Sequence, residues 1–160
     1  MTAQPIGPHP DIATVFLGGC LWGHRFEVRL VLHHVEADDF ASPMLGTVAE
    51  AIRPLIDADK PIGPQMVLDE LRRTGSLSTA VAKHLQDAAT SGADTDLPLR
   101  HYGAALLAES LRRRVESAGA ALSSAAAEAS EADVARIVTN ATTSIYDCLA
   151  RLHHLRGDTA

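Results

Sequence analysis

Four of the eight histidines in the chain form two adjacent pairs that could ligate a metal ion. The pairs are His33 with His34 and His153 with His154. Adjacent residues on a helix point about 100° apart, so neighbouring imidazoles rarely bind the same ion. We therefore expect surface or partly buried histidines and no metal site.

Serine, histidine and aspartate are all present, but the sequence context of a hydrolase is not. A nucleophilic serine of that class lies on a sharp strand-to-helix turn, and no strand-rich segment could carry one. An ATP-driven motor requires a GxxxxGK[ST] loop, whose backbone amides cradle phosphates. The two lysines, Lys60 and Lys83, do not follow a glycine. We expect no catalytic residue, no cofactor and no enzyme activity.

The chain is acidic, with a formal net charge of −6. Because binding to a nucleic-acid backbone depends on clustered lysine and arginine, direct nucleic-acid binding is not expected. One basic run, Arg112, Arg113 and Arg114, is a candidate docking patch for an acidic partner or a phosphate backbone. The alternative is a solvated helix face on which Glu109 and Glu116 are the partners of these arginines.

The two cysteines, Cys20 and Cys148, lack CxxC spacing and lie among apolar residues. Buried thiols in a reducing compartment explain both positions. Residues 1–10 lack the basic and apolar segments of a signal peptide. The apolar run 12–22 is shorter than the ~20 residues that span a membrane. We expect a cytoplasmic protein that makes no membrane contact.

The composition predicts an all-α fold, because alanine is abundant and aromatic residues make up only 4%. Residues 1–10 hold three prolines and are expected to form a flexible lead-in. We predict a globular bundle of about five or six helices over 11–97, followed by a long antiparallel helical hairpin over 98–156, as one structural unit. Gly18 and Gly19 would let a second helix approach closely, and Trp22 is expected in the core.

The hairpin is predicted from apolar residues at alternating steps of three and four along two segments. The segments run from Leu111 to Ala129 and from Val134 to Leu155. Ser130 can cap the second helix with Asp133 as its partner, and so short a connection makes the helices antiparallel neighbours. We take the larger seam residues as the hairpin seam and dimer contact: Leu111, Val115, Leu122, Val138, Ile145 and Leu152.

A hairpin only two helices wide cannot bury all of its apolar surface. Leu106, Leu107, Ile137 and Leu149 widen the apolar stripes beside the seams. The N-terminal helices or a second copy of the chain must cover this surface, which predicts a homodimer or a higher oligomer.

Three stretches in register resemble the N-terminal domain of DnaB-type replicative helicases. The first is the opening segment 8–21 with its Leu17-Gly18 pair, and the second runs from 37 to 75 with an Asp39-Phe40 turn, a helix, a proline-containing loop and a short helix ending in glycine. The third begins at His101-Tyr102 and leads into the hairpin. The chain stops near Leu155, where the family's linker to its motor would begin. We therefore expect a diverged domain without its motor, either a fragment or a free-standing paralogue.

In that family the domain is not catalytic: it dimerises through the hairpin, forms a collar above the motor ring, and receives primase and loading factors. The resemblance implies a protein-interaction and oligomerisation module of DNA replication, whose partners are the replicative helicase, the primase or a loader. The alternative is a small helical ligand-binding or regulatory protein unrelated to replication. That alternative requires an apolar pocket between the N-terminal helices.

Overall fold

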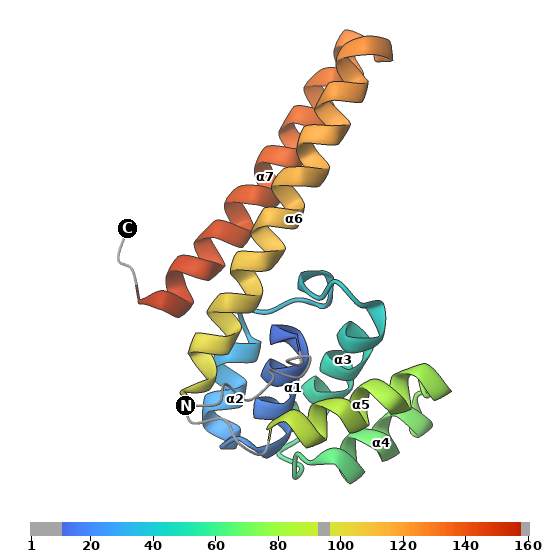
Figure 1. Cartoon of the computed structure of the whole chain (residues 1–160), viewed down its shortest axis with the longest axis vertical. Coiled ribbons are helices and arrows are strands. Elements are labelled where there is room, and N and C mark those ends of the chain that lie inside the picture. Colours follow the sequence, from blue (N-terminus) through green and yellow to red (C-terminus); the bar gives the residue numbers. More distant parts are fainter. Residues whose placement is uncertain (1–10, 93–96, 158–160) are drawn as a thin grey trace, which may run out of the picture.

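The computed structural model describes residues 11–92 and 97–157, and every regular element within these ranges is helical. The elements are α1 (Ile12–Trp22), α2 (Arg25–Leu32), the 3-10 helix η1 (Ala37–Asp39), α3 (Pro43–Asp57), α4 (Pro64–Arg73), α5 (Thr79–Ser91), α6 (Leu99–Glu128) and α7 (Glu131–Arg156). A bundle is followed by a long hairpin (Figure 1), which confirms the predicted fold class. The predicted lead-in, residues 1–10, lies outside the described residues.

Helix α1 is the centre of the bundle. It packs against α3, α5 and α6, and Phe16, Leu17 and Cys20 on it are fully buried. Helix α1 is apolar on every face, and such a helix is stable only where neighbouring helices cover all of its faces. None of the helices in the described part of the chain is both long and apolar enough to span a membrane.

Side chains and backbone conformation fix the helix ends. The Asp11 carboxylate accepts a hydrogen bond from the Thr14 amide at 2.8 Å, and the Ser78 hydroxyl accepts one from the Val81 amide at 3.1 Å. Pro43 occupies the first turn of α3, where its missing N–H costs nothing. Gly75 has a φ of 72°, a left-handed conformation that stops α4 at the predicted position.

The connection between α6 and α7 is formed by Ala129 and Ser130. The Ser130 hydroxyl accepts from the Asp133 amide at 3.2 Å and lies 2.8 Å from the Asp133 carboxylate, as the capping prediction requires. The two helices run side by side in opposite directions, and their tip projects away from the bundle (Figure 1). Most of the hairpin is therefore outside the globular core.

Trp22 is not in the core, contrary to the prediction. Its side chain is 57% exposed at the end of α1, and the indole N–H donates to the Ala89 carbonyl at 2.7 Å. The amphipathic indole thus covers the end of α5 while its ring remains in solvent.

The glycine pair in α1 permits the close approach of helices that the sequence predicts. A Cβ built on Gly18 would lie 2.3 Å from the Ala88 carbonyl oxygen and 2.5 Å from the Cα of Gly92. A Cβ built on Gly19 would lie 2.8 Å from a methyl group of Leu99. Because the obstacles at Gly18 are backbone atoms, no side-chain movement can relieve the overlap there.

Replacing Gly18 by alanine should destabilise the fold by about 2 kcal/mol or more, since α5 must move away from α1. The matched control is Gly119→Ala in α6, where nothing lies within 4 Å of an added Cβ. The control should be neutral or should stabilise by up to about 1 kcal/mol, because alanine is the better helix former. Urea denaturation followed by circular dichroism measures both. Equal stability of the two variants would contradict the close contact.

Candidate protein-interaction site

The hairpin is covered by the bundle only near its base. Helices α1 and α2 and the 3-10 helix η1 contact α6, and Leu106 and Leu107 are buried there. Beyond Ser110, only Ala125 among the α6 residues is buried. On α7 the buried residues, Cys148, Leu152 and Leu155, all lie in the last third of the helix. The distal part of the hairpin therefore has no cover from the rest of the described chain.

The six residues predicted as seam and dimer contact fall into two groups. Leu152 is buried, and Leu111 and Ile145 are half-buried. Val115, Leu122 and Val138 are 50%, 37% and 45% exposed, so they lie at the edge of the α6–α7 contact and are not enclosed by it. Their place in a dimer contact stays a prediction. Tyr146, at 65% exposed, adds a fourth large apolar side chain in solvent.

The predicted residues border one face of the hairpin. Leu111 and Val115 of α6 and Leu152 of α7 line the same hollow of about 490 Å³. Leu122 continues the α6 stripe seven residues beyond Val115, and Val138 and Ile145 continue the α7 stripe at spacings of seven. We call this surface the apolar face: Leu111, Val115, Leu122, Val138, Ile145 and Leu152.

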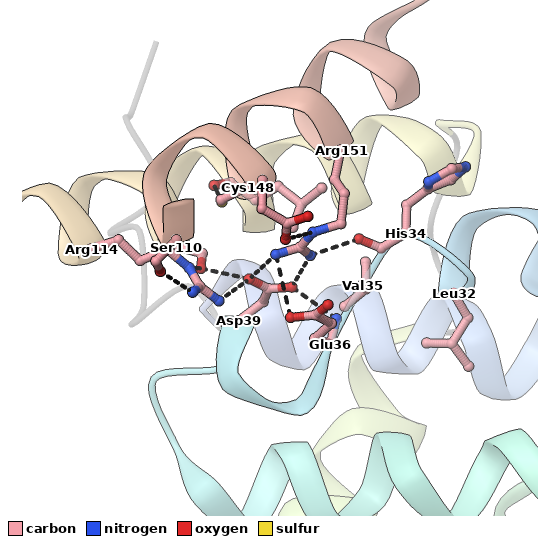
Figure 2. Close-up of polar contacts among 12 residues, drawn as sticks. Leu32, His34, Val35, Glu36, Asp39, Ser110, Arg114, Cys148 and Arg151 are labelled. Atoms are coloured by element: carbon pink, nitrogen blue, oxygen red, sulfur yellow. Dashed lines mark hydrogen bonds and ion pairs between the residues drawn. The ribbon is translucent and has the colours of Figure 1, made fainter. Parts of the chain in front are cut away.

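Asp39 joins the base of the hairpin to the bundle (Figure 2). Its side chain is fully buried, and its carboxylate accepts hydrogen bonds from the Ser110 hydroxyl at 2.7 Å and the Glu36 amide at 2.8 Å. Arg114 of α6 lies 3.0 Å away and Arg151 of α7 lies 2.5 Å away. One carboxylate at the end of η1 therefore holds both helices of the hairpin.

Arg151 reaches the bundle at two further points. Its guanidinium donates to the His34 carbonyl at 2.8 Å and lies 3.5 Å from the Glu36 carboxylate. On its own helix it is paired with Asp147 at 3.1 Å. Arg114 similarly donates to the Ser144 hydroxyl at 2.7 Å, which connects α6 to α7. The contacts give the hairpin a defined direction relative to α2 and η1.

The charges in this cluster stabilise one another. Burial alone would raise the pKa of Asp39, but hydrogen bonds from Arg151, the Glu36 amide and Ser110 outweigh it and hold the pKa below its ordinary value of 3.8. Burial alone would lower the pKa of Arg151, but the Asp39 carboxylate raises it. Both groups therefore stay ionised at neutral pH.

The three consecutive arginines do not form a continuous docking patch. Arg114 pairs with Asp39, and Arg113 donates to the Asp39 carbonyl at 2.5 Å. Arg112 remains exposed beside the hollow of the apolar face. Two of the three guanidinium groups thus hold the hairpin on the bundle, a role that neither sequence interpretation anticipated.

The histidine pairs do not supply a metal site in the described part of the chain, where no group of three potential ligands is found. The contact that does form joins one member of each pair. The rings of His34, after α2, and His154, on α7, have centroids 4.3 Å apart. Cys20 and Cys148 are free and buried as predicted, and burial raises the pKa of both thiols.

Sequence reasoning singled out the Asp39-Phe40 turn but missed its ion pairs. Phe40 packs on Phe16 of α1, with ring centroids 6.2 Å apart. Asp39 meets Arg114 and Arg151, which lie 75 and 112 residues further along the chain. The available signal was an arginine in each hairpin helix, but nothing in a single sequence pairs such distant charges.

Comparisons with known proteins agree with this architecture. A sequence profile of the DnaB-like helicase N terminal domain matches residues 9–106. The crystal structure of the N-terminal domain of DnaB helicase from Mycobacterium tuberculosis superposes with a TM-score of 0.70 at 28% identity, covering 88% of this chain and 99% of that one. No significant match was found among functionally curated proteins.

The bundle with its protruding hairpin is the architecture of a helicase-associated domain. Because the profile covers more than half of the sequence, the chain belongs to the DnaB-like helicase N terminal domain family, as its sequence motifs predicted.

Replacing Asp39 by asparagine should destabilise the fold by about 3 kcal/mol or more, because two partly buried guanidinium groups lose their anion. The matched control is Asp38→Asn in the same turn, an exposed residue whose substitution should change stability by less than about 0.5 kcal/mol. Urea denaturation at neutral pH measures both.

The stability deficit of Asp39→Asn should also depend on pH. The pKa of Asp39 is lower in the folded chain, so its contribution is fully present above the ordinary value of 3.8 and is lost as the pH falls through the lowered pKa. The wild-type and variant curves should converge only at strongly acidic pH. A pH-independent gap would show that packing, and not the charge, gives Asp39 its effect.

Proposed function

We propose that the chain is a non-catalytic protein-interaction and oligomerisation module that acts in DNA replication in the cytoplasm. It pairs with a second copy through the apolar face of the hairpin, with bundle and hairpin acting as one unit. The pair then presents its surfaces to the replicative helicase, the primase or a loader. The observation that supports this proposal most directly is the uncovered apolar face on a member of this family.

Exposure and helical spacing both favour an antiparallel or parallel helix pair as the contact. Val115, Leu122 and Val138 keep 37% to 50% of their surface in solvent. Clustered apolar side chains that remain exposed are typical of a protein-protein contact. A second hairpin brings the same apolar stripes, so a two-fold contact would bury both faces at once.

The alternative of a small-molecule binding protein has less support. It requires an apolar pocket between the N-terminal helices. The hollow of about 600 Å³ between η1, α3 and α4 is open and has the carboxylates Asp38, Glu50 and Glu70 in its lining. Such a lining differs from the predicted apolar pocket.

Oligomerisation can be tested by placing charge on the apolar face. Val115 and Val138 are exposed, so Val115→Asp combined with Val138→Asp should leave the fold intact. The double variant should weaken self-association by about a hundredfold or more, because two carboxylates per chain would be buried without partners. Light scattering on a sizing column over a range of concentrations measures the mass, and circular dichroism checks the helix content.

The matched control carries the same charge change on the opposite face of the hairpin. Ala121 and Asn140 are exposed and line the hollow on that side. Ala121→Asp with Asn140→Asp should remain a dimer or higher oligomer. If the control is monomeric and the first variant is not, the contact lies on the opposite face. A wild-type chain that is monomeric at high concentration would overturn the proposal.

The replication role can be tested by capture with immobilised chain from a lysate of its own host, followed by immunodetection of the helicase, primase and loader. Binding of at least one of them by the wild type is the expected result. Loss of helicase capture in the Val115→Asp, Val138→Asp variant would show that it joins the helicase through the apolar face. Absence of all three from the wild-type capture would contradict a role in replication.

A further inference from the structure

Two histidines from distant parts of the chain meet where the end of the hairpin contacts the bundle. His34 follows α2, and His154 lies in the last turn of α7. Their ring centroids are 4.3 Å apart at an interplanar angle of 34°. His33 packs edge-on against His34 at 5.2 Å. Three imidazoles therefore gather at one junction between two elements.

The same junction already holds a positive charge. Arg151, one turn before His154, donates to the backbone carbonyl of His34 itself. Nearby carboxylates are engaged: Asp39 with Arg114 and Arg151, and Glu36 and Asp147 with Arg151. A proton on the His34 ring would thus be added beside two other imidazoles and a guanidinium, with no free carboxylate facing it among these contacts.

We propose that the His34–His154 stack is a pH-sensitive clasp, which holds the C-terminal end of α7 on the turn after α2 at neutral pH and releases it in mildly acidic solution. Neutral imidazoles can stack, whereas two imidazolium rings at this distance repel each other and Arg151. Opening the clasp would free the end of α7 while Asp39, a much stronger acid, still holds the base of the hairpin.

The direction of the proton linkage agrees with this assignment. Burial, followed by His154, His33 and Arg151, lowers the pKa of His34 below its ordinary value of 6.5. A histidine with a lowered pKa favours the folded contact above the ordinary value, and that preference is lost as the pH falls through the lowered pKa. The clasp should therefore be closed above pH 6.5 and should open below it.

The test compares wild type with His34→Phe, which keeps an aromatic ring in the stack and removes the imidazole whose lowered pKa carries the proton linkage. The control is His101→Phe, because His101 is an exposed histidine on α6. Amide hydrogen exchange at Leu152 and Leu155, corrected for intrinsic rates, is measured at about pH 7.5 and about pH 5.5, on either side of the ordinary histidine pKa.

Protection in wild type and His101→Phe should fall severalfold on acidification, because the preference for the folded contact is lost as His34 takes up a proton. Protection in His34→Phe should stay nearly constant. An equal fall in all three proteins would overturn the clasp. If His34→Phe does not fold, a proton NMR titration of the wild-type rings decides: a titration of His34 below 6.5 supports the clasp, and one at or above 6.5 overturns it.

Discussion

The hairpin depends on one buried carboxylate. Asp39 is the last residue of a short 3-10 helix, yet it accepts from residues of both hairpin helices and from the backbone of its own turn. Removing such an anion from water is unfavourable unless every oxygen is satisfied, and here they are. Because ionic geometry is more directional than apolar packing, the Asp39 contacts specify an orientation as well as an association.

The apolar core and the ionic junction have different tasks in this fold. Packing around Phe16 and Leu17 holds the bundle, where α1 is covered on all sides. Leu106, Leu107 and Cys148 at the base of the hairpin belong to that core, but the distal hairpin extends beyond it and receives little of its stabilisation. The distal hairpin carries half-buried and exposed apolar residues along one face. This is the surface that we propose a second copy of the chain covers.

Local signals in the sequence were sufficient to predict the helices and their ends, but they could not predict the ion pairs of Asp39 that join the hairpin to the bundle. Asp11, Ser130, Pro43 and Gly75 lie at helix ends because their effects act within a few residues, and the structure confirms them. The heptad pattern found the two hairpin helices, but it did not show that Val115, Leu122 and Val138 stay 37% to 50% exposed within the single chain, since three-four spacing cannot separate the centre of a stripe from its edge. The pairing of Asp39 with Arg114 and Arg151, and of His34 with His154, depends on tertiary placement.

Because α6 is long, a small change of its direction at the Asp39 junction produces a larger displacement at the tip of the hairpin. From Arg114 to the end of α6 at Glu128 the helix rises about 20 Å, and the junction residues all lie at one end of this span. A tilt of about 10° around Asp39 would therefore move the tip by roughly 4 Å, about two thirds of the rise of one helical turn. Small rearrangements among a few polar atoms in the bundle would thus shift the register of whatever packs against the distal hairpin.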